Sequence, residues 1–236
     1  MIRFYAPDIA ETLTLPESDS GHAVRVLRLG AGAELEVTDG QGRIYSCRIA
    51  DPHPKHARVE LTGVRDCPPV WTQEIVVAVA PTKHIDRMEW LVEKLVEIGI
   101  SRFIPVLTSR SERKIIKRER IEKIAVSAMK QSLKATLPVI DDMMPLAEVL
   151  TLMPDAQRYV GYCDDAVERR DFARTYTPRR DTLILIGPEG DFSPAEIERV
   201  LGAGIIPVTF GDNRLRTETA ALYAASACHI LDAHAR

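Results

Sequence analysis

The chain has 236 residues, of which 45% are hydrophobic, with a formal net charge of −3 and four cysteines. This length allows one large domain or two modest ones with a substantial core. No apolar stretch approaches membrane-spanning length and no leader is apparent, which predicts a cytoplasmic protein without a membrane span. The cysteines are far apart and the histidines lack ligand spacing, so neither a disulfide framework nor a metal site is expected.

Charge is unevenly distributed along the chain. Residues 71–140 carry 13 Lys/Arg against 8 Asp/Glu, whereas residues 1–70 carry 8 against 10 and residues 141–236 carry 10 against 16. The basic middle third is typical of an RNA-contacting surface, but neighbouring glutamates make a solvated helix face laced with ion pairs an equally simple interpretation. Its densest part comprises Arg110, Arg113, Lys114, Lys117, Arg118, Arg120 and Lys123.

The first 70 residues are predicted to be rich in β-structure. Leu35–Thr38 and Arg43–Ile49 flank a glycine-bearing turn and indicate a hairpin, and Ala57–Leu61 alternates as a half-buried strand does. The Cys67–Val70 segment contains two prolines and breaks the pattern. We therefore expect one domain over residues 1–70 and a second over residues 72–236.

The second domain alternates strand and helix patterns, which predicts an α/β fold with a mainly parallel sheet. The apolar run Ile75–Ala80 indicates a strand covered on both faces, and Asp86 is expected to cap a helix that ends before Gly99. Further strands are expected at Phe103–Leu107, Arg158–Tyr162, Thr182–Ile186 and Ile206–Phe210, and further helices over Ile121–Met129, after Ser193 and from about Thr219.

Two segments near the end of the chain, Leu185–Gly190 and Phe210–Ala220, each follow a predicted strand and lead into a predicted helix. Such a pair indicates a ligand held largely by backbone at the carboxyl ends of adjacent strands, although ordinary tight turns would look similar. Neither segment has phosphate-loop spacing, and Pro188 removes a backbone donor that a phosphate would use. The flanking side chains are apolar and suit an adenine ring, which favours a nucleoside-like cofactor: Leu185, Ile186, Phe210 and Leu215.

Several spaced motifs together resemble one known family. They are His22–Gly30 with Thr38–Gly40, Lys83–Gly99 with Pro105–Leu107 and Arg110–Glu112, and finally Ile186–Gly190 and Leu215–Ala220. Over its whole length the chain is similar to the RsmE-type 16S rRNA uridine methyltransferases of the SPOUT class.

The resemblance implies a small PUA-like RNA-binding β-barrel at the N-terminus and a C-terminal α/β domain tied in a trefoil knot. It also implies an S-adenosyl-L-methionine-dependent homodimer with its active site near the subunit interface. The product would be a uridine methylated at N3 in 16S rRNA, within the small ribosomal subunit. By position, the implied cofactor-binding residues are Leu185, Ile186, Gly187, Gly190, Phe210, Gly211, Leu215, Arg216, Thr217 and Ala220.

Methylation of an imide nitrogen requires removal of its proton and stabilisation of the resulting anion. Arg216 is the candidate for anion stabilisation or phosphate placement, with an ion pair to Glu218 or Glu189 as its alternative role. Glu189 and Glu218 are both candidate bases, and the sequence does not choose between them. The candidate RNA contacts are Arg25, Arg28, Lys83, Arg87, Lys130 and Lys134.

The chain departs from the family pattern at three places. Leu133-Lys134 stands where many members have Gly-Arg, and Asp191 stands where many repeat glycine. In the second loop, Asn213 and Arg214 replace a residue that is often basic and one that is often aliphatic. The glycine framework of both loops is retained, so the departures bear on RNA contacts more than on the cofactor.

Other functions are compatible with parts of this pattern. A non-catalytic RNA-binding or ribosome-assembly module would show degenerated cofactor loops, and here both are intact. A nucleotide-binding metabolic enzyme would need a phosphate loop or an acidic ribose anchor, and neither is found. A SPOUT methyltransferase acting on another RNA stays open.

If the cationic candidates contact phosphates, RNA binding should weaken steeply with salt, because each contact releases condensed counterions. We expect the logarithm of the association constant to fall by roughly 0.7 per phosphate contact for each tenfold rise in salt on single-stranded RNA. Fluorescence anisotropy titrations at several KCl concentrations measure this slope. A flat response would count against the assignment.

Overall fold

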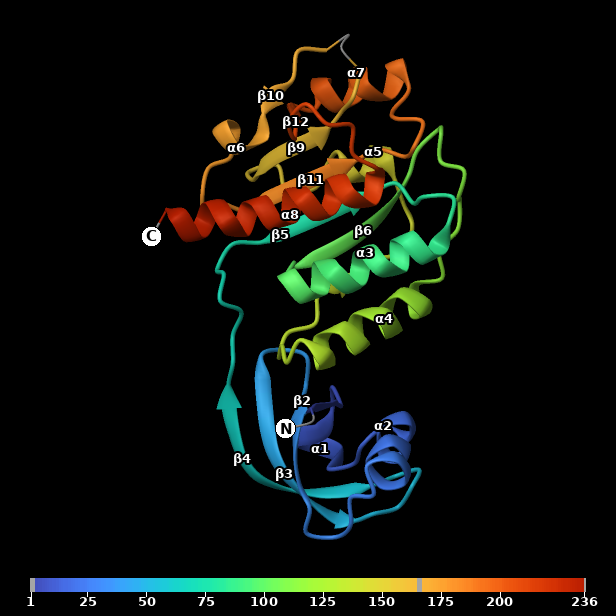
Figure 1. Ribbon diagram of the computed structural model, residues 1–236, viewed down its shortest axis with the longest axis vertical. Coiled ribbons are helices and arrows are strands. Elements are labelled where there is room, and N and C mark those ends of the chain that lie inside the picture. The colour runs from blue at the N-terminus through green and yellow to red at the C-terminus, as the bar shows by residue number, and fades with distance from the viewer. Residues whose placement is uncertain (1–2, 165–166, 236) are drawn as a thin grey trace. The chain divides into compact units, whose positions relative to one another are not determined.

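The computed structural model describes residues 3–164 and 167–235. The chain divides into two compact units, one formed by Met1–Val70 with Val126–Leu137 and the other by Trp71–Ala125 with Pro138–Arg236. Segment Val126–Leu137, which we expected in the second domain, thus belongs to the first unit by its contacts. Figure 1 traces the chain from one unit to the other.

The first unit contains a four-stranded sheet in the order β1-β2-β3-β4. The predicted hairpin is present, with Thr38 opposite Ile44 across the turn. Asp39 Oδ1 closes this turn by accepting hydrogen bonds from the backbone amides of Gln41 at 2.7 Å and Arg43 at 3.2 Å. The elements of this unit are β1 (Arg3–Tyr5), α1 (Ile9–Thr12), α2 (Glu17–Gly21), the π-helical η1 (His22–Val26), β2 (Glu34–Thr38), β3 (Arg43–Asp51) and β4 (Arg58–Asp66).

Polar contacts attach the end of helix α4 (Arg118–Gln131) and the residues after it to this unit. Lys130 Nζ lies 2.7 Å from Asp19 Oδ1, and the Arg3 guanidinium donates to the Leu133 carbonyl. Leu133 itself has a φ of 56°, in the left-handed region that glycine adopts most easily. The glycine that the resemblance implies at this position would suit this backbone conformation, which the chain adopts with leucine.

The second unit is built on an eight-stranded sheet with the order β10-β12-β9-β11-β5-β6-β7 and with β8 paired to β6. The strand pairings in it are parallel, as expected for alternating strands and helices. Its strands are β5 (Ile75–Val79), β6 (Arg102–Leu107), β7 (Val139–Ile140), β8 (Met144–Pro145), β9 (Gln157–Gly161), β10 (Arg170–Asp171), β11 (Thr182–Ile186) and β12 (Ile206–Thr209).

Helices cover both faces of this sheet, which explains why β5 and β11 are buried along their whole length. Helices α3 (Ile85–Ile98) and α8 (Thr217–His234) lie side by side, and α8 packs on β5 and β11 (Figure 1). Helices α5 (Leu146–Val149) and α7 (Pro194–Gly202) contribute to the core on the other face, and the short α6 (Phe172–Thr175) contacts α8.

Two of the expected helix starts shift in the structure. Helix α3 begins at Ile85 with His84 as its N-cap, so the expectation that Asp86 caps it is wrong. Asp86 lies instead in the first turn, where its negative charge is favourable beside the helix amino terminus. Helix α8 begins at Thr217, two residues before the expected start. Ser193 does cap α7, with Glu196 completing a capping box.

Glu196 also fastens α7 to the segment after β6. Its carboxylate accepts hydrogen bonds from the amide and hydroxyl of Ser109 at 2.6 and 2.7 Å, and from those of Ser193 at 2.9 and 2.8 Å. Burial raises the pKa of Glu196, but these hydrogen bonds outweigh burial and hold the pKa below its ordinary value. The ionised carboxylate is therefore the form that the fold stabilises.

Replacing this carboxylate, Glu196→Gln, should lower the free energy of unfolding at pH 7 by about 2 kcal/mol, because hydrogen bonds to the charged group are lost. Because the folded-state pKa lies below the unfolded-state pKa of about 4.3, this stabilisation is fully present at pH values above 4.3. The stabilisation is lost as the pH falls through the folded-state pKa. Urea unfolding at pH 7 and pH 3 should show the gap between variant and wild type narrowing at low pH. The exposed Glu198→Gln on the same helix should change stability by less than about 0.5 kcal/mol.

Candidate functional site

The two loops expected to hold a ligand leave the carboxyl ends of β11 and β12. Strand β9 lies between β11 and β12, so the expectation that the loops follow adjacent strands is wrong. Gly161, the last residue of β9, leaves space for side chains from the two loops to approach each other over this strand. A Cβ there would come within 2.8 Å of Ile186 Cδ1 and 2.9 Å of Phe210 Cε2, so only glycine lets these two side chains approach over the strand end.

A buried hydrogen bond joins the two loops directly. Thr217 Oγ1 donates to the Gly187 carbonyl at 3.1 Å, across 30 residues of sequence. Gly187 is itself packed tightly, because a Cβ there would lie 2.9 Å from the Phe192 ring. The two loops therefore form one substructure at the end of the sheet where the parallel strands have their carboxyl termini.

The structure places the sequence-predicted cofactor residues around this junction. Leu185, Ile186 and Gly187 are buried, and so is Thr217 at the start of α8. Phe210, Leu215 and Ala220 are half-buried, whereas Gly190, Gly211 and Arg216 are exposed. This distribution gives the loops an apolar interior with an accessible rim.

The structure gives Asp191 a structural role, which the sequence did not reveal. Its φ is 58°, a left-handed conformation that aspartate tolerates better than most side chains. Its carboxylate accepts hydrogen bonds from the amides of Phe192 at 2.8 Å and Cys163 at 3.0 Å. Burial raises the pKa of this carboxyl. Asp191 thus ties the first loop to the residues that follow β9.

Two arginines of the basic segment donate hydrogen bonds to the carbonyls of neighbouring loops. Arg110 donates through Nη1 to the carbonyls of Gly190 at 2.8 Å and Phe192 at 3.2 Å. Arg113 donates to the carbonyls of Thr82 at 3.3 Å and Lys83 at 2.7 Å. The segment after β6 therefore stabilises the loop that follows β11 and the loop that precedes α3.

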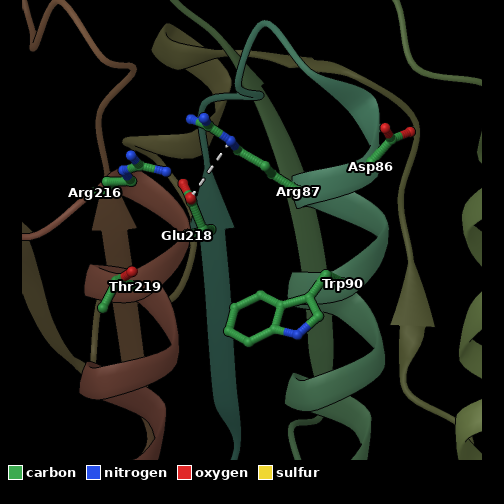
Figure 2. A pocket seen from close by; sticks show the side chains of 6 residues that line it. All are labelled: Asp86, Arg87, Trp90, Arg216, Glu218 and Thr219. Carbon is green, nitrogen blue, oxygen red and sulfur yellow. Dashed lines mark ion pairs between the residues drawn. The ribbon is translucent and has the colours of Figure 1, made fainter.

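A cavity of about 550 Å³ opens beside the second loop, between the amino-terminal turns of α3 and α8. Figure 2 shows side chains from both helices around it: Asp86, Arg87, Trp90, Arg216, Glu218 and Thr219. Sequence reasoning singled out Arg87, Arg216 and Glu218 but missed Trp90. Its signal was helical spacing, because Trp90 falls outside the apolar face that Met88, Leu91 and Leu95 form, but this pattern does not place it beside α8.

Glu218 is the most unusual group in this cavity. The residue is only 6% exposed, and Arg87 Nε lies 3.8 Å from its Oε1. The second carboxylate oxygen, Oε2, is buried without a hydrogen-bond partner among the described residues. A buried carboxylate oxygen in this condition is costly, because a donor from water has been lost and not replaced.

The other candidate base, Glu189, has different surroundings. It is exposed, and its Oε1 accepts a hydrogen bond from the Lys83 amide at 3.2 Å. The ion pair that we considered for Arg216 is not recorded among the described residues, where Glu218 pairs with Arg87 instead. The structure thus separates two glutamates that the sequence could not distinguish.

The candidate RNA contacts fall into two groups. Arg25 and Arg28 are exposed in the first unit. Lys130 pairs with Asp19 and lies 5.8 Å above the Phe4 ring, and burial lowers the pKa of Lys134. In the second unit Lys83 Nζ lies 3.1 Å from Glu112, and Arg87 faces the cavity. Arg25 and Arg28 are therefore the most available of the six.

Over residues 3–164 and 167–235, the structure groups no set of histidine, cysteine and acidic side chains that could hold a metal ion. In the same part of the chain, no helix combines the length and apolar character needed to cross a bilayer.

Comparison with known proteins shows the family to which this chain belongs. A sequence model described as an RNA methyltransferase domain matches residues 69–229, more than half of the chain. The chain belongs to this RNA methyltransferase family. A second model, described as an RNA methyltransferase PUA domain, matches residues 15–62. The expected family and the expected α/β fold with an N-terminal PUA domain are confirmed.

Individual members of the RNA methyltransferase family align with nearly the whole chain. A probable rRNA-methyltransferase from Porphyromonas gingivalis has 45% identity and a TM-score of 0.95, with 100% of both chains covered. The ribosomal RNA small subunit methyltransferase E of Neisseria gonorrhoeae, solved bound to S-adenosyl methionine, has 25% identity and a TM-score of 0.84 over 98% of both chains. The protein of the same name from Bacillus subtilis (strain 168) is 28% identical over 92% of this chain and 90% of its own.

The hydrogen bond between the loops can be tested by Thr217→Val, which keeps the side-chain shape but leaves the buried Gly187 carbonyl without its donor. We expect the free energy of unfolding to fall by about 1–3 kcal/mol. Thr217→Ser retains the hydroxyl and should lose much less. Chemical denaturation of the three proteins measures the difference, and equal losses in both variants would contradict a role for the hydrogen bond.

Proposed function

We propose that this protein is an S-adenosyl-L-methionine-dependent methyltransferase that methylates N3 of a uridine in 16S rRNA. The observation that carries the proposal is the junction of two cofactor-type loops at Thr217 and Gly187, next to a cavity that contains a buried glutamate. Membership of the RNA methyltransferase family and the alignment with a methyltransferase solved with S-adenosyl methionine support it.

The two loops fit an adenosine-containing cofactor. Gly211 has a φ of 101°, and no atom lies within 4 Å of the position a Cβ would take, so the backbone there is open to a ligand. Phe210 and Leu215 offer half-buried apolar surface on either side of this glycine, which suits the faces of an adenine ring. When bound, S-adenosyl-L-methionine supplies an electrophilic methyl group on a sulfonium.

The side chains beside the loops would act on the acceptor. Arg216 is the N-cap residue of α8 and is exposed, with no side-chain partner recorded among the described residues. Its guanidinium can stabilise the negative charge that develops on a uracil when N3 loses its proton, or can position a phosphate. A buried carboxylate in the adjacent cavity favours an enzyme over a non-catalytic assembly module.

The first unit would dock the RNA, with residues 1–70 as the PUA-like domain and residues 72–236 as the methyltransferase domain. Arg25 and Arg28 are exposed there and can contact phosphates. Because the substrate is ribosomal RNA, we place the protein in the cytoplasm and take the small ribosomal subunit as the particle that it acts on. The trefoil knot implied by the resemblance remains part of this proposal.

A homodimer is also part of the proposal. Tyr223 and Ile230 are seven residues apart on α8, so they lie on one face, and they are 51% and 57% exposed. Large apolar side chains in such an arrangement favour contact with a second protein surface, and a second copy of this chain would bury them.

The test is methyl transfer from radiolabelled S-adenosyl-L-methionine to small ribosomal subunits from cells that lack this protein, followed by nucleoside analysis. We expect label in 3-methyluridine. Cofactor binding without transfer to these subunits would direct the search to another RNA, and absence of cofactor binding would favour the assembly module.

Arg216→Ala should lower the rate of methyl transfer by about 10²-fold or more, as is typical for loss of a group that stabilises developing charge. Cofactor affinity should change much less, because the loop backbone is untouched. Single-turnover kinetics and isothermal titration with S-adenosyl-L-methionine separate the two effects. An unchanged rate would remove Arg216 from the mechanism.

A further inference from the structure

The cavity between α3 and α8 is lined by a buried carboxylate, two arginines and a tryptophan, which are side chains that can contact one nucleobase. We propose that it receives the uracil ring, with Glu218 accepting the N3 proton and with Arg87 and Arg216 contacting the two ring carbonyl oxygens. This inference rests on the function proposed above and assigns the acceptor base a place in the structure.

The order of donors and acceptors in the cavity complements the edge of uracil. The Watson–Crick edge of uracil presents an acceptor, a donor and an acceptor: O2, N3–H and O4. In Figure 2 the Glu218 carboxylate is directed into the space between the Arg216 and Arg87 guanidinium groups. The protein therefore offers a donor, an acceptor and a donor, which is the complement of the uracil edge.

One carboxylate oxygen of Glu218 lacks a hydrogen-bond donor among the described residues. Oε2 is buried without a hydrogen-bond partner among the described residues, in a side chain that is 8% exposed. Arg87 balances the charge from 3.8 Å, a distance beyond that of a hydrogen bond, so it does not occupy either oxygen fully. A uracil held by Arg87 and Arg216 brings its imide N–H to this side chain, and a small rotation of the carboxylate toward the cavity gives Oε2 the donor that it lacks.

The cavity also has an aromatic surface on which a base can stack. Trp90 is 43% exposed and lies on the same side of α3 as Arg87, one turn further along. Stacking of a base on an aromatic side chain contributes roughly 1–3 kcal/mol in single-stranded nucleic-acid sites. The cavity of about 550 Å³ is within the usual range for small-ligand pockets, and a single ring with its ribose fits such a volume.

The same polarity predicts discrimination between bases. Cytosine presents an amine at C4 and an unprotonated N3, so a donor would face an arginine and a lone pair would face the Glu218 carboxylate. Both contacts are repulsive, and such mismatches of buried polar groups discriminate strongly. A 3-methyluridine has no N3 proton to donate, which weakens binding of the product.

The proton step then follows from the residues present. The N3–H bond breaks, its electron pair stays on N3, and the proton bonds to the Glu218 carboxylate. Arg87 and Arg216 stabilise the charge that the anion delocalises onto O2 and O4. The N3 electron pair forms the new bond to the methyl carbon, and the electron pair of the broken carbon–sulfur bond stays on the sulfur of the spent cofactor.

The decisive variant is Glu218→Gln, which keeps the size of the side chain but removes its basicity. We expect single-turnover methyl transfer to small ribosomal subunits to fall at least 100-fold, the lower end of the usual range for loss of a general base. Affinity for S-adenosyl-L-methionine should stay within about threefold, since the loops keep their hydrogen bond. The exposed Glu198→Gln removes an equal charge from α7 and should transfer methyl groups at the wild-type rate.

A chemical rescue separates a base from a structural residue. RNA transcribed with 5-fluorouridine has a more acidic N3–H, so a larger fraction of the anion forms without help from the protein. The deficit of Glu218→Gln should shrink on this RNA by at least tenfold, whereas the deficit of a misfolded variant would not. A deficit that is equal on both RNAs overturns the role of Glu218.

Binding of the base can be measured without any methyl transfer. Saturation-transfer NMR with uridine 5′-monophosphate, in the presence of S-adenosylhomocysteine, should show contact with the ring protons of the wild-type protein. Cytidine 5′-monophosphate and 3-methyluridine 5′-monophosphate should give weaker signals, and Trp90→Ala should lose the uridine signal. An unchanged signal in Trp90→Ala overturns the pocket assignment.

The outcomes also separate this inference from the proposed function. A wild-type protein that methylates N3 while Glu218→Gln is equally active overturns the inference alone. A wild-type protein that methylates no RNA but still shows the Trp90-dependent uridine signal overturns the proposed function and leaves the base pocket standing.

Discussion

The hydrogen bond from Thr217 Oγ1 to the Gly187 carbonyl joins two loops that leave strands separated by a third. Since Thr217 is also the first residue of α8, the same contact fixes where that helix begins. The position of the helix start in turn sets the directions of Arg216 and Glu218. The missing side chain of Gly161 is the matching constraint, because it lets Ile186 and Phe210 meet over the intervening strand.

Burial of a carboxylate beside this junction is tolerable for two physical reasons. Glu218 lies in the first turn of α8, where the helix dipole favours negative charge, and Arg87 supplies an opposite charge from the neighbouring helix. Neither interaction satisfies Oε2 by a hydrogen bond. A site that is electrostatically balanced but short of one donor is suited to a ligand that brings that donor with it.

The basic character of the middle third of the chain has more than one origin. Arg110 and Arg113 donate to loop carbonyls, and Lys130 pairs with Asp19 within the first unit. These cations already make contacts within the fold, which reduces their availability to phosphates, whereas Arg25 and Arg28 are exposed without a recorded contact among the described residues. A charge count along the sequence registers all of them alike, so it overstates the surface available to RNA.

The sequence by itself determined the parallel α/β sheet, the β-hairpin, the two loops and the family, because each depends on local periodicity, turn chemistry or spaced motifs. Only the tertiary structure decided that Trp90 lines a cavity, that Gly161 permits the approach of the loops, and that Glu218 is buried while Glu189 is exposed. Burial and partner choice depend on which distant segments pack together. Two glutamates in similar loop contexts are therefore equivalent in sequence and become different only once α3 lies against α8.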